Sequence, residues 1–445
     1  MARYLDHMKR ALALIALLAW AGTVAVLVVL AVNHALEALG SFLCTGVAVA
    51  AGWVALVTRR WLRWLGLVVA VVAVAAALAI LIGDGAFVTL AVYVVLVALA
   101  AGATSLALKG TGHAAGWERL PAPGRPVLIM NPWSGGGKVE RFNLPDECRK
   151  RGIEPVLLAS GDDLRQLALD AADSGAGALG MAGGDGSQAI VAQVAMEHGL
   201  PYVCVPAGTR NHLALDLGVD RDDVVGALDA YGDEGLERTI DLATINGSVF
   251  VNNVSLGVYA EIVQSDEYRD DKVGTALRKL PDLVGPDAEP FDLHFAAPDG
   301  DEHATAHLLM VSNGPYRLDR LFGMGTRPRL DSGVLGIVSV AIDGPGPAAE
   351  FVALEGAGQA ARFRGWRTWA ATEFVVEADK PVPAGVDGEA LTLVPPLRFA
   401  TRPGALRVRL APHHPGRSPS AEMPSDAGEA MAALGRTAFG RAPAG

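Results

Sequence analysis

Four long apolar runs in the first quarter of the chain constrain the fold more than any other feature of the sequence. They cover residues 11–32, 39–57, 64–82 and 86–108. Each can form a helix that crosses the hydrocarbon core of a bilayer, which takes about 20 residues. We therefore predict a multi-domain membrane protein in which residues 1–110 form a transmembrane anchor of four helices.

The loops between these runs differ in their basic residues, and this difference predicts an orientation. Basic residues lie before the first run, between the second and third, and after the fourth: Lys9, Arg10, Arg59, Arg60, Arg63 and Lys109. The other two loops, 33–38 and 83–85, contain none. By the positive-inside rule, both termini and all of 125–445 lie in the cytoplasm, with the anchor in the inner membrane. The alternative is that the runs are buried helices of a large soluble core.

The charges divide the chain in the same place. Residues 1–124 hold eight Lys/Arg and four Asp/Glu, a formal charge of +4. Residues 125–445 have a formal charge of −15, and the two parts together give the net charge of −11. A nucleic-acid-binding domain normally presents a basic patch, so the acidic part argues against a nucleic-acid partner. The apolar runs contain almost no ionisable groups, which favours an anchor over a pump or a channel.

The acidic part begins with a pattern typical of α/β proteins. Strand-like runs at 127–130, 155–159, 178–182 and 202–205 alternate with helical stretches at 139–151, 162–174 and 187–198. This alternation predicts a parallel, doubly wound sheet over residues 125–240. Ligands of such sheets bind at the carboxyl ends of the strands.

The rest of the chain is different in character. Short β-rich runs separated by turn residues predict a mainly antiparallel β-sandwich domain over 241–396. Residues 397–410 are expected to form a strand that returns to the first domain. Pro, Gly, Ser and Ala dominate 411–445, which predicts a disordered tail.

Three glycine-containing loops follow three of the predicted strands. They are NPWSGGGK at 131–138, GGDGS at 183–187 and PAGTRNHLA at 206–214. Glycines let the backbone approach an anion, and a helix start favours phosphate. The first loop is not a Walker A motif, because Pro132 stands at its first glycine position and Val139 follows the lysine. An aspartate such as Asp185 in an anion-binding pocket suits a Mg²⁺ ion that accompanies a nucleotide. The alternative is that the glycines serve tight turns only.

In this order and spacing the three loops resemble the bacterial diacylglycerol kinase family, which is related to sphingosine kinases and more distantly to NAD kinases. The resemblance continues through 241–263, 312–316, 329–340 and 386–393, and covers about 125–410. It implies a two-domain, ATP-dependent lipid kinase whose active site lies in the interdomain cleft. The implied substrate is a membrane lipid, with diacylglycerol converted to phosphatidic acid as the leading reaction. The alternatives are a nucleotide- or lipid-binding sensor with altered catalysis, and an NAD kinase-like activity; a homodimer remains open.

The resemblance also implies roles for individual residues. Asp185 would engage Mg²⁺ with ATP, and Asp387 and Glu389 of VDGE match the acidic pair of the catalytic base. The residues that would hold ATP are Asn131, Ser134, Gly135, Gly136, Ser160, Gly183, Gly184, Asp185, Gly186, Ser187, Thr209 and Asn211. Phosphoryl transfer needs a carboxylate to accept the hydroxyl proton, and two carboxylates two residues apart on a strand would face the same side. The alternative for VDGE is a β-turn with exposed acids.

Three positions depart from the family pattern. Ile190 stands where the family commonly has Glu. His212 stands where the family usually has Asp, which predicts an exposed histidine at a helix start; the alternative is a general base. The family's DDG reads Asp331-Ser332-Gly333 here, so a structural Mg²⁺ site at Asp331 is in doubt. We interpret these changes as those of a divergent subfamily with altered substrate choice.

Overall fold

The fold is known from a computed structural model of the chain. It describes residues 2–33, 35–57, 61–83, 86–108, 116–257, 291–298, 300, 302–303, 306–318, 325–342, 344–422 and 427–439. Arg59, Arg60 and Lys109, which entered the orientation argument, lie outside the described residues, as does the stretch 258–263 of the family resemblance.

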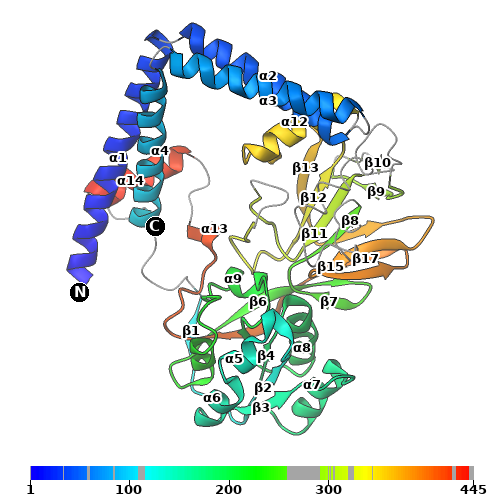
Figure 1. Cartoon of the computed structure of the whole chain (residues 1–445). Coiled ribbons are helices and arrows are strands. Elements are labelled where there is room, and N and C mark those ends of the chain that lie inside the picture. The colour runs from blue at the N-terminus through cyan, green and yellow to red at the C-terminus, as the bar shows by residue number, and fades with distance from the viewer. Residues whose placement is uncertain are drawn as a thin grey trace.

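The N-terminal region is helical, as the apolar runs predict. It consists of α1 (Ala2–Asn33), α2 (Ala35–Val57), α3 (Trp61–Gly83) and α4 (Ala86–Leu108). α1 packs along α4, and α2 packs along α3, so that the two pairs run in different directions (Figure 1). The α1–α4 contact uses small residues, among them the buried Ala16 and Ala103. It also contains a hydrogen bond that Trp20 Nε1 donates to Thr104 Oγ1 over 3.2 Å.

Two of these helices are long and apolar enough to cross a membrane, judged by length and composition. They are His7–Asn33 in α1 and Val88–Leu108 in α4. The described apolar segments of α2 and α3 are shorter, Leu39–Gly52 and Trp64–Ile80. A span takes about 20 residues, so among the described residues the prediction of four spans is wrong in number. The helices α2 and α3 themselves each have 23 residues, as the apolar runs predict.

The first globular domain is built on a nine-stranded sheet. Its main order is β1 (Glu118–Arg119), β6 (Leu236–Ile245), β17 (Leu397–Leu410), β5 (Tyr202–Val205), β4 (Ala178–Ala182), β2 (Pro126–Met130) and β3 (Glu154–Leu157). β7 (Ser248–Phe250) pairs with β6, and β14 (Glu373–Val376) with β17. Strands β3, β2, β4 and β5 are parallel, and β2, β4 and β5 are buried throughout, because their apolar side chains have helices to pack against. The predicted parallel α/β arrangement is confirmed.

Short and medium helices connect these strands. They are α5 (Lys138–Arg141), α6 (Leu144–Lys150), α7 (Leu164–Asp173), α8 (Asp185–Glu197) and α9 (His212–Asp216). Asp163 caps α7, since its carboxylate accepts hydrogen bonds from the backbone N–H groups of Arg165 and Gln166. α8 begins within GGDGS and α9 within PAGTRNHLA, and α8 packs on β4 and β5. Both loops therefore lie at the carboxyl edge of the sheet.

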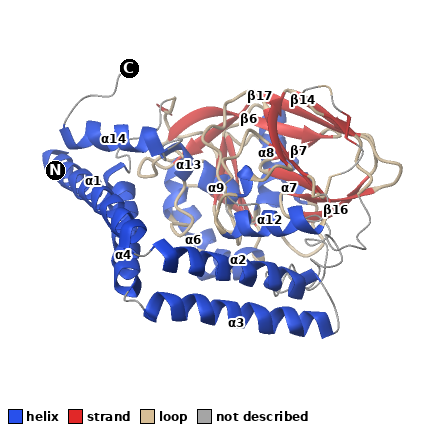
Figure 2. Cartoon of the chain, turned by 90° about the horizontal axis from the view of Figure 1, so that it is seen from above, coloured by secondary structure: helices blue, strands red, loops and turns tan. Residues whose placement is uncertain are grey.

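The second domain is an antiparallel six-stranded sheet, which confirms the predicted class. Its order is β13 (Trp366–Ala371), β12 (Leu335–Val340), β11 (Leu308–Ser312), β8 (Asn253–Gly257), β15 (Val382–Val386) and β16 (Glu389–Leu393). One face packs on β6, β7, β14 and β17 of the first sheet through Phe250, Phe374 and Phe399. The other face is covered by α12 (Pro345–Gly356) through Phe351 (Figure 2).

Two long strands, β6 and β17, belong to both cores. Ile240 of β6 is buried in the core of the first domain, and Ile245 of the same strand is buried in the sandwich. In β17, Phe399 lies in the sandwich, whereas Val408 lies in the first core and pairs in parallel with Tyr202 of β5. The boundary at 240/241 therefore falls inside a continuous strand.

The prediction of a disordered tail is wrong for 411–422 and 427–439. The first part packs on the body of the protein, where His414, Ser418 and Ser420 are buried, and ends in α13 (Pro419–Glu422). The second part forms α14 (Ala427–Phe439), which crosses α1 and α4 (Figures 1 and 2). Its Leu434 is buried against alanines of both helices. Small residues suggested disorder, but they also allow close packing once a partner surface exists.

Candidate active site

The three glycine-containing loops meet at the carboxyl ends of β2, β4 and β5. A Cβ atom on Gly135 of the first loop would lie 2.3 Å from the carbonyl oxygen of Ala207 in the third loop. A Cβ atom on Gly208 of the third loop would lie 2.5 Å from Cα of Gly184 in the second. Gly135 also has a φ of 56°, which L side chains rarely adopt. These glycines therefore let the backbones of the loops touch.

Other glycines in the loops leave the backbone open. Gly136 and Gly184 have no atom within 4 Å of a Cβ position. Gly184 is also the N-cap residue of α8, and no side chain caps this end of the helix. The first N–H groups of a 13-residue helix thus have no intrahelical partner at the point where the loops meet. The helix dipole and these donors favour an anion there.

Polar side chains hold the loops in shape from within. Asn211, which is buried, accepts a hydrogen bond from the N–H of Gly208 over 2.8 Å and donates to the carbonyl oxygens of Pro206 and Gly208. Asn131 accepts a hydrogen bond from the N–H of Trp133 over 3.0 Å. Both N–H groups of the Asn211 amide therefore have partners inside their own loop, and its contact with ATP stays a prediction.

Two further side chains tie the loops to their surroundings. Lys138 Nζ donates to the carbonyl oxygen of Pro206 over 3.2 Å, which links the first loop to the third. The buried Gln188 Nε2 lies within 3.2 Å of three carbonyl oxygens, those of Met181, Gly183 and Val205. The sequence interpretation missed Gln188, although its place one turn into the helix after GGDGS could have suggested it.

The remaining predicted nucleotide contacts lie at the same edge of the sheet. Ser134 is in a short 3-10 turn of the first loop, and Ser187 is in the first turn of α8; both are half-buried. Thr209 is exposed on the third loop. Ser160 is exposed in the segment after β3, the strand next to β2. All four hydroxyls are thus placed at or near the strand ends.

Asp185 connects the second loop to the third. Its buried carboxylate accepts hydrogen bonds from the N–H groups of His212 over 3.0 Å and Leu213 over 3.1 Å, which are the first two residues of α9. Each oxygen keeps further lone pairs after this contact. A hard-oxygen ligand for Mg²⁺ therefore remains available, so Asp185 fits the predicted metal role while also serving as a helix cap.

The VDGE element forms a two-residue β-hairpin. Val386 pairs with Glu389, and the turn residues Asp387 and Gly388 have φ values of 49° and 87°. Positive φ at both positions, with the sequence Asp-Gly, is typical of a type I′ turn. Asp387 is thus in the turn and Glu389 begins β16, so the expectation that both lie on one strand and face the same side is wrong.

The Asp387 carboxylate is turned into the protein. Its oxygens accept hydrogen bonds from the backbone N–H groups of Val251 (2.9 Å), Asn252 (2.8 Å) and Asn253 (3.2 Å). Burial raises the pKa of Asp387 to about 7, although the N–H groups of Val251 and Asn252 lower it. The negative charge of Asp185 raises this pKa further. A β-turn with two exposed acids is therefore not what the structure contains.

Glu389 is exposed and lies over the second loop. A Cβ atom on Gly186 would come within 2.9 Å of Glu389 Cγ. The hairpin of the second sheet thus reaches GGDGS of the first sheet. Asp387 and Glu389 of the hairpin therefore face the second loop, which carries Asp185, across the junction of the two domains.

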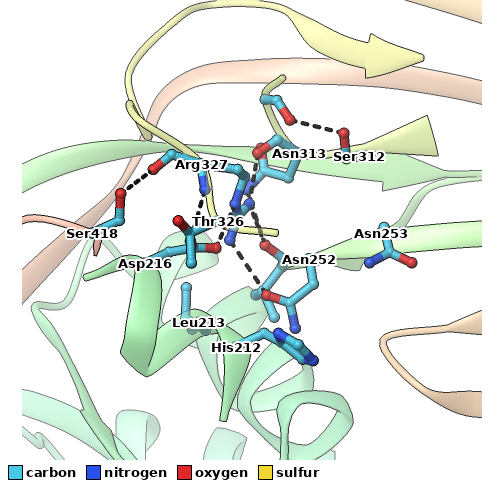
Figure 3. Close-up of polar contacts among 12 residues, drawn as sticks. His212, Leu213, Asp216, Asn252, Asn253, Ser312, Asn313, Thr326, Arg327 and Ser418 are labelled. Atoms are coloured by element: carbon cyan, nitrogen blue, oxygen red, sulfur yellow. Dashed lines mark hydrogen bonds and ion pairs between the residues drawn. The ribbon is translucent and has the colours of Figure 1, made fainter. Parts of the chain in front are cut away.

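His212 is half-buried at the start of α9, so the expectation of an exposed histidine is wrong. Burial lowers its pKa, while the neighbouring charges of Asp185 and Asp216 raise it. Figure 3 shows its ring on the side of Asn252, with Asp216 further along the same helix. Ile190, on α8, is exposed.

Asp331 lies apart from these groups and is paired with two arginines. Its oxygens contact Arg238 Nη2 over 2.9 Å and Arg329 Nε over 3.0 Å. Ser332 offers no carboxylate, and its hydroxyl donates to the carbonyl oxygen of Val334 over 3.4 Å. Because two cations already neutralise Asp331, the residues present do not fit a second, structural Mg²⁺ site.

A buried ion pair joins the two domains beside the site. Arg327 Nε contacts Asp216 Oδ2 over 2.7 Å, and neither side chain is more than 1% exposed (Figure 3). The guanidinium also donates to carbonyl oxygens of Val251 and Asn313. The sequence interpretation missed both residues. Asp216 could have been noticed at the end of the third loop's helix, whereas nothing in the sequence marks Arg327.

Comparison with known proteins gives a family likeness for part of the chain. This part contains the loops whose open backbone donors face the carboxylate-bearing hairpin. Residues 125–245 match the family model of the diacylglycerol kinase catalytic domain. This segment of the chain is similar to the diacylglycerol kinase catalytic domain family.

The relatives cover part of the chain. A diacylglycerol kinase of Mycobacterium tuberculosis (strain ATCC 25618 / H37Rv) is 32% identical over 135 residues, which is 29% of this chain and 43% of the relative. A diacylglycerol kinase of Bacillus subtilis (strain 168) is 32% identical over 144 residues, 31% of this chain and 47% of the relative. The chain thus spans less than half the length of these curated relatives.

A solved structure extends the likeness in fold. It is a crystal structure of a candidate diacylglycerol kinase from Bacillus anthracis str. Sterne, with a TM-score of 0.50 and 21% identity. The match covers 65% of this chain and 97% of that chain. At this identity the likeness shows a shared fold alone.

Proposed function

We propose that the protein is a membrane-bound, ATP-dependent lipid kinase that transfers the γ-phosphate of ATP to a lipid hydroxyl, with diacylglycerol as the leading acceptor and phosphatidic acid as the product. The observation that carries the proposal is the Asp387 hairpin, which faces the glycine-containing loops across the domain junction. One side of this junction is suited to bind phosphates, and the other carries a base.

The loops would bind the nucleotide through the backbone. The N–H groups at the start of α8 and the open glycines Gly136 and Gly184 point to a polyphosphate rather than to an apolar ligand. The hydroxyls of Ser134, Ser187 and Thr209 add donors around them. Mg²⁺, held by Asp185 with Glu389 nearby, would neutralise charge on the transferred phosphate.

Asp387 would accept the proton of the attacking hydroxyl. Three backbone N–H groups fix the orientation of its carboxylate, so it does not have to be ordered during the reaction. A pKa of about 7 is well matched to a general base near neutral pH, because about half of the groups are ionised and the base is still strong.

The apolar helices α1 and α4 would hold the enzyme in the cytoplasmic membrane, with residues 125–445 in the cytoplasm. Helix α14, which follows the catalytic domains, packs on the N-terminal half of α1 and the C-terminal end of α4, so the two helices also contact the rest of the protein through α14. Tethering raises the effective concentration of a membrane-bound acceptor, which an acidic domain could not achieve by charge. Lipid would then enter from the adjacent leaflet.

The test supplies radiolabelled ATP and dioleoylglycerol, or a total lipid extract, to membranes that contain the full-length protein. We expect a labelled phospholipid that is lost in Asp387→Asn and Asp185→Asn. Asp173→Asn serves as the matched control, because this exposed carboxylate ends α7 away from the site.

Three other outcomes are informative. Labelling that survives both site substitutions would show that the site is assigned wrongly. ATP binding without any labelled lipid would indicate a sensor, and phosphorylation of NAD in place of lipid would indicate an NAD kinase-like activity.

A further inference from the structure

Arg327 and Asp216 form a buried ion pair whose hydrogen bonds are almost completely satisfied. Asp216 Oδ1 accepts from the backbone N–H of Arg327 over 2.9 Å, and Oδ2 accepts from its Nε over 2.7 Å. Arg327 Nη1 donates to Val251 O over 2.7 Å and to Asn313 O over 2.6 Å. The Tyr316 ring lies 5.4 Å from the guanidinium carbon. Such a pair is costly to bury, and its partners must be in place together.

Each end of the pair is attached to one half of the candidate active site. Figure 3 shows Asp216 on the helix of His212 and Leu213, and Arg327 in contact with Asn252 and Asn313. Asp216 is the last residue of α9, and the first two N–H groups of this helix are held by Asp185. Arg327 binds the carbonyl oxygen of Val251 and, over 3.3 Å, the side chain of Asn252. The N–H groups of these two residues donate to Asp387. The same short segment is thus held by Arg327 on one side and by Asp387 on the other.

We propose that the Arg327–Asp216 pair is a positioning element that places the Asp387 carboxylate opposite the nucleotide-binding loops. The proposal rests on the proposed kinase function. The path runs from Asp185 through α9 to Asp216, across the domain junction to Arg327, and through residues 251–253 to Asp387. Neither Arg327 nor Asp216 needs to touch the substrate.

The planar fork of Arg327 is essential to this role. It reaches a carboxylate, two carbonyl oxygens and an amide oxygen from one buried position. A lysine would carry the same charge but has three donors on one atom and cannot make these divergent contacts. Replacement by Lys therefore separates the geometric role of the side chain from its charge.

The first experiment compares Arg327→Lys and Arg327→Met in the full-length protein. If the pair positions Asp387, both variants lose kcat by about 10²-fold, as expected for a misplaced catalytic group, and the KM for ATP changes less. Arg327 lowers the pKa of Asp387, and Asp185 raises it. Arg327→Met should therefore move the acidic limb of the kcat profile to higher pH, whereas Arg327→Lys should leave it in place.

Arg327→Met leaves the buried Asp216 carboxylate without its partner, which can unfold the protein. A double variant avoids this problem. Asp216→Leu with Arg327→Met removes both charges at similar volume, a change that buried pairs often tolerate. We expect the folded double variant to keep the low kcat. A double variant with kcat close to that of the unchanged protein would overturn the proposal.

Arg409→Met is the matched control. Arg409 is also buried and donates to the carbonyl oxygens of Leu120, Pro121, Ala230 and Gly232, at the edge of the sheet that carries β1. Its loss should lower thermal stability without moving the pH limb. If Arg409→Met and Arg327→Met reduce kcat in equal proportion to their loss of folded protein, the role of Arg327 is structural only.

Hydrogen exchange gives a readout that does not require catalysis. In Arg327→Met the N–H groups of residues 251–253 should exchange faster, because their hydrogen bonds to the Asp387 carboxylate are weakened. Arg409→Met should leave the exchange rate of this peptide unchanged. An unchanged exchange rate in Arg327→Met would contradict the positioning role. If the unchanged protein phosphorylates no lipid, the proposed function fails, and this measurement still decides whether the pair positions Asp387.

Discussion

The two sides of the candidate active site present different chemical groups to the domain junction. On the side of the first sheet, glycines and backbone N–H groups face the junction, and side chains such as Asn211 and Gln188 serve to hold the loops. On the side of the second sheet, a tight hairpin offers carboxylates, and the backbone of 251–253 serves to hold Asp387. Backbone N–H groups thus face the domain junction on one side, and on the other side they hold a carboxylate that faces it. This division suggests that binding and proton transfer can be changed separately.

The largest expected effect is on the hairpin side. Asp387→Asn keeps the size of the side chain but removes its ability to accept a proton, so kcat should fall by about 10²–10⁴-fold. The dissociation constant for ATP, measured by equilibrium binding, should stay within about twofold of that of the unchanged protein. The reason is that the proposed contacts to the phosphates come from the loops of the first sheet. A parallel loss of ATP binding would break the comparison.

The loop side should respond in the opposite way. Gly208→Ala places a Cβ atom 2.5 Å from Cα of Gly184, so the second and third loops must separate. Overpacking of this kind costs about 1–3 kcal/mol, and ATP binding should weaken by a corresponding 5- to 150-fold or so. Gly124→Ala is the control at the other end of β2, because nothing lies within 4 Å of its Cβ position. Equal ATP affinity in the two variants would mean that the loops do not form the nucleotide site.

The pH dependence should report the hairpin side alone. Burial raises the pKa of Asp387 to about 7, above the ordinary value of an aspartate, so the active, ionised form is lost as the pH falls through this value. We expect kcat/KM to drop on the acidic side with a midpoint near pH 7, measured from about pH 5 to about pH 9. A midpoint near the usual aspartate range would indicate that Asp387 is ionised throughout and that another step sets the profile.

The smallest effect is expected at Asp331. Asp331→Asn breaks contacts with Arg238 and Arg329 that are partly exposed, so it should cost less than about 1 kcal/mol of folding free energy. The Mg²⁺ concentration for half-maximal activity should not change, because two arginines neutralise this carboxylate. A large increase in that concentration would show that a structural metal binds there after all.

Local motifs in the sequence predicted the parts of the molecule that local motifs determine. The alternation of strands and helices predicted the parallel sheet, and the three loops and VDGE could be found because each is short and continuous. Asp387 was identified, but the hairpin geometry was not, since a strand reading ignored the Asp-Gly preference for a type I′ turn. The roles of Asn131 and Asn211 inside their loops also needed three-dimensional information.

The features that were missed depend on contacts between distant segments. Arg327 and Asp216 are 111 residues apart, and no pattern near Arg327 distinguishes it from an exposed arginine. Ser418 reads as part of a polar, low-complexity tail, yet its hydroxyl donates to the carbonyl oxygen of Arg327 over 2.5 Å. Composition indicates whether a segment can be ordered by itself. These residues are ordered because they pack on a surface that other segments of the chain form.

The continuity of β6 and β17 through both cores limits how the molecule can move. Two domains joined by a flexible linker can rotate as rigid bodies, whereas these two share hydrogen-bonded strands. The register between β6 and β17 shifts once, between Arg402 and Leu406, where Asp241 accepts hydrogen bonds from the N–H groups of Gly404 and Gly333. Irregularities of this kind are the places where a sheet bends. A rotation of one domain against the other would therefore have to bend these shared strands, and we expect the bend at the irregularity beside Asp241.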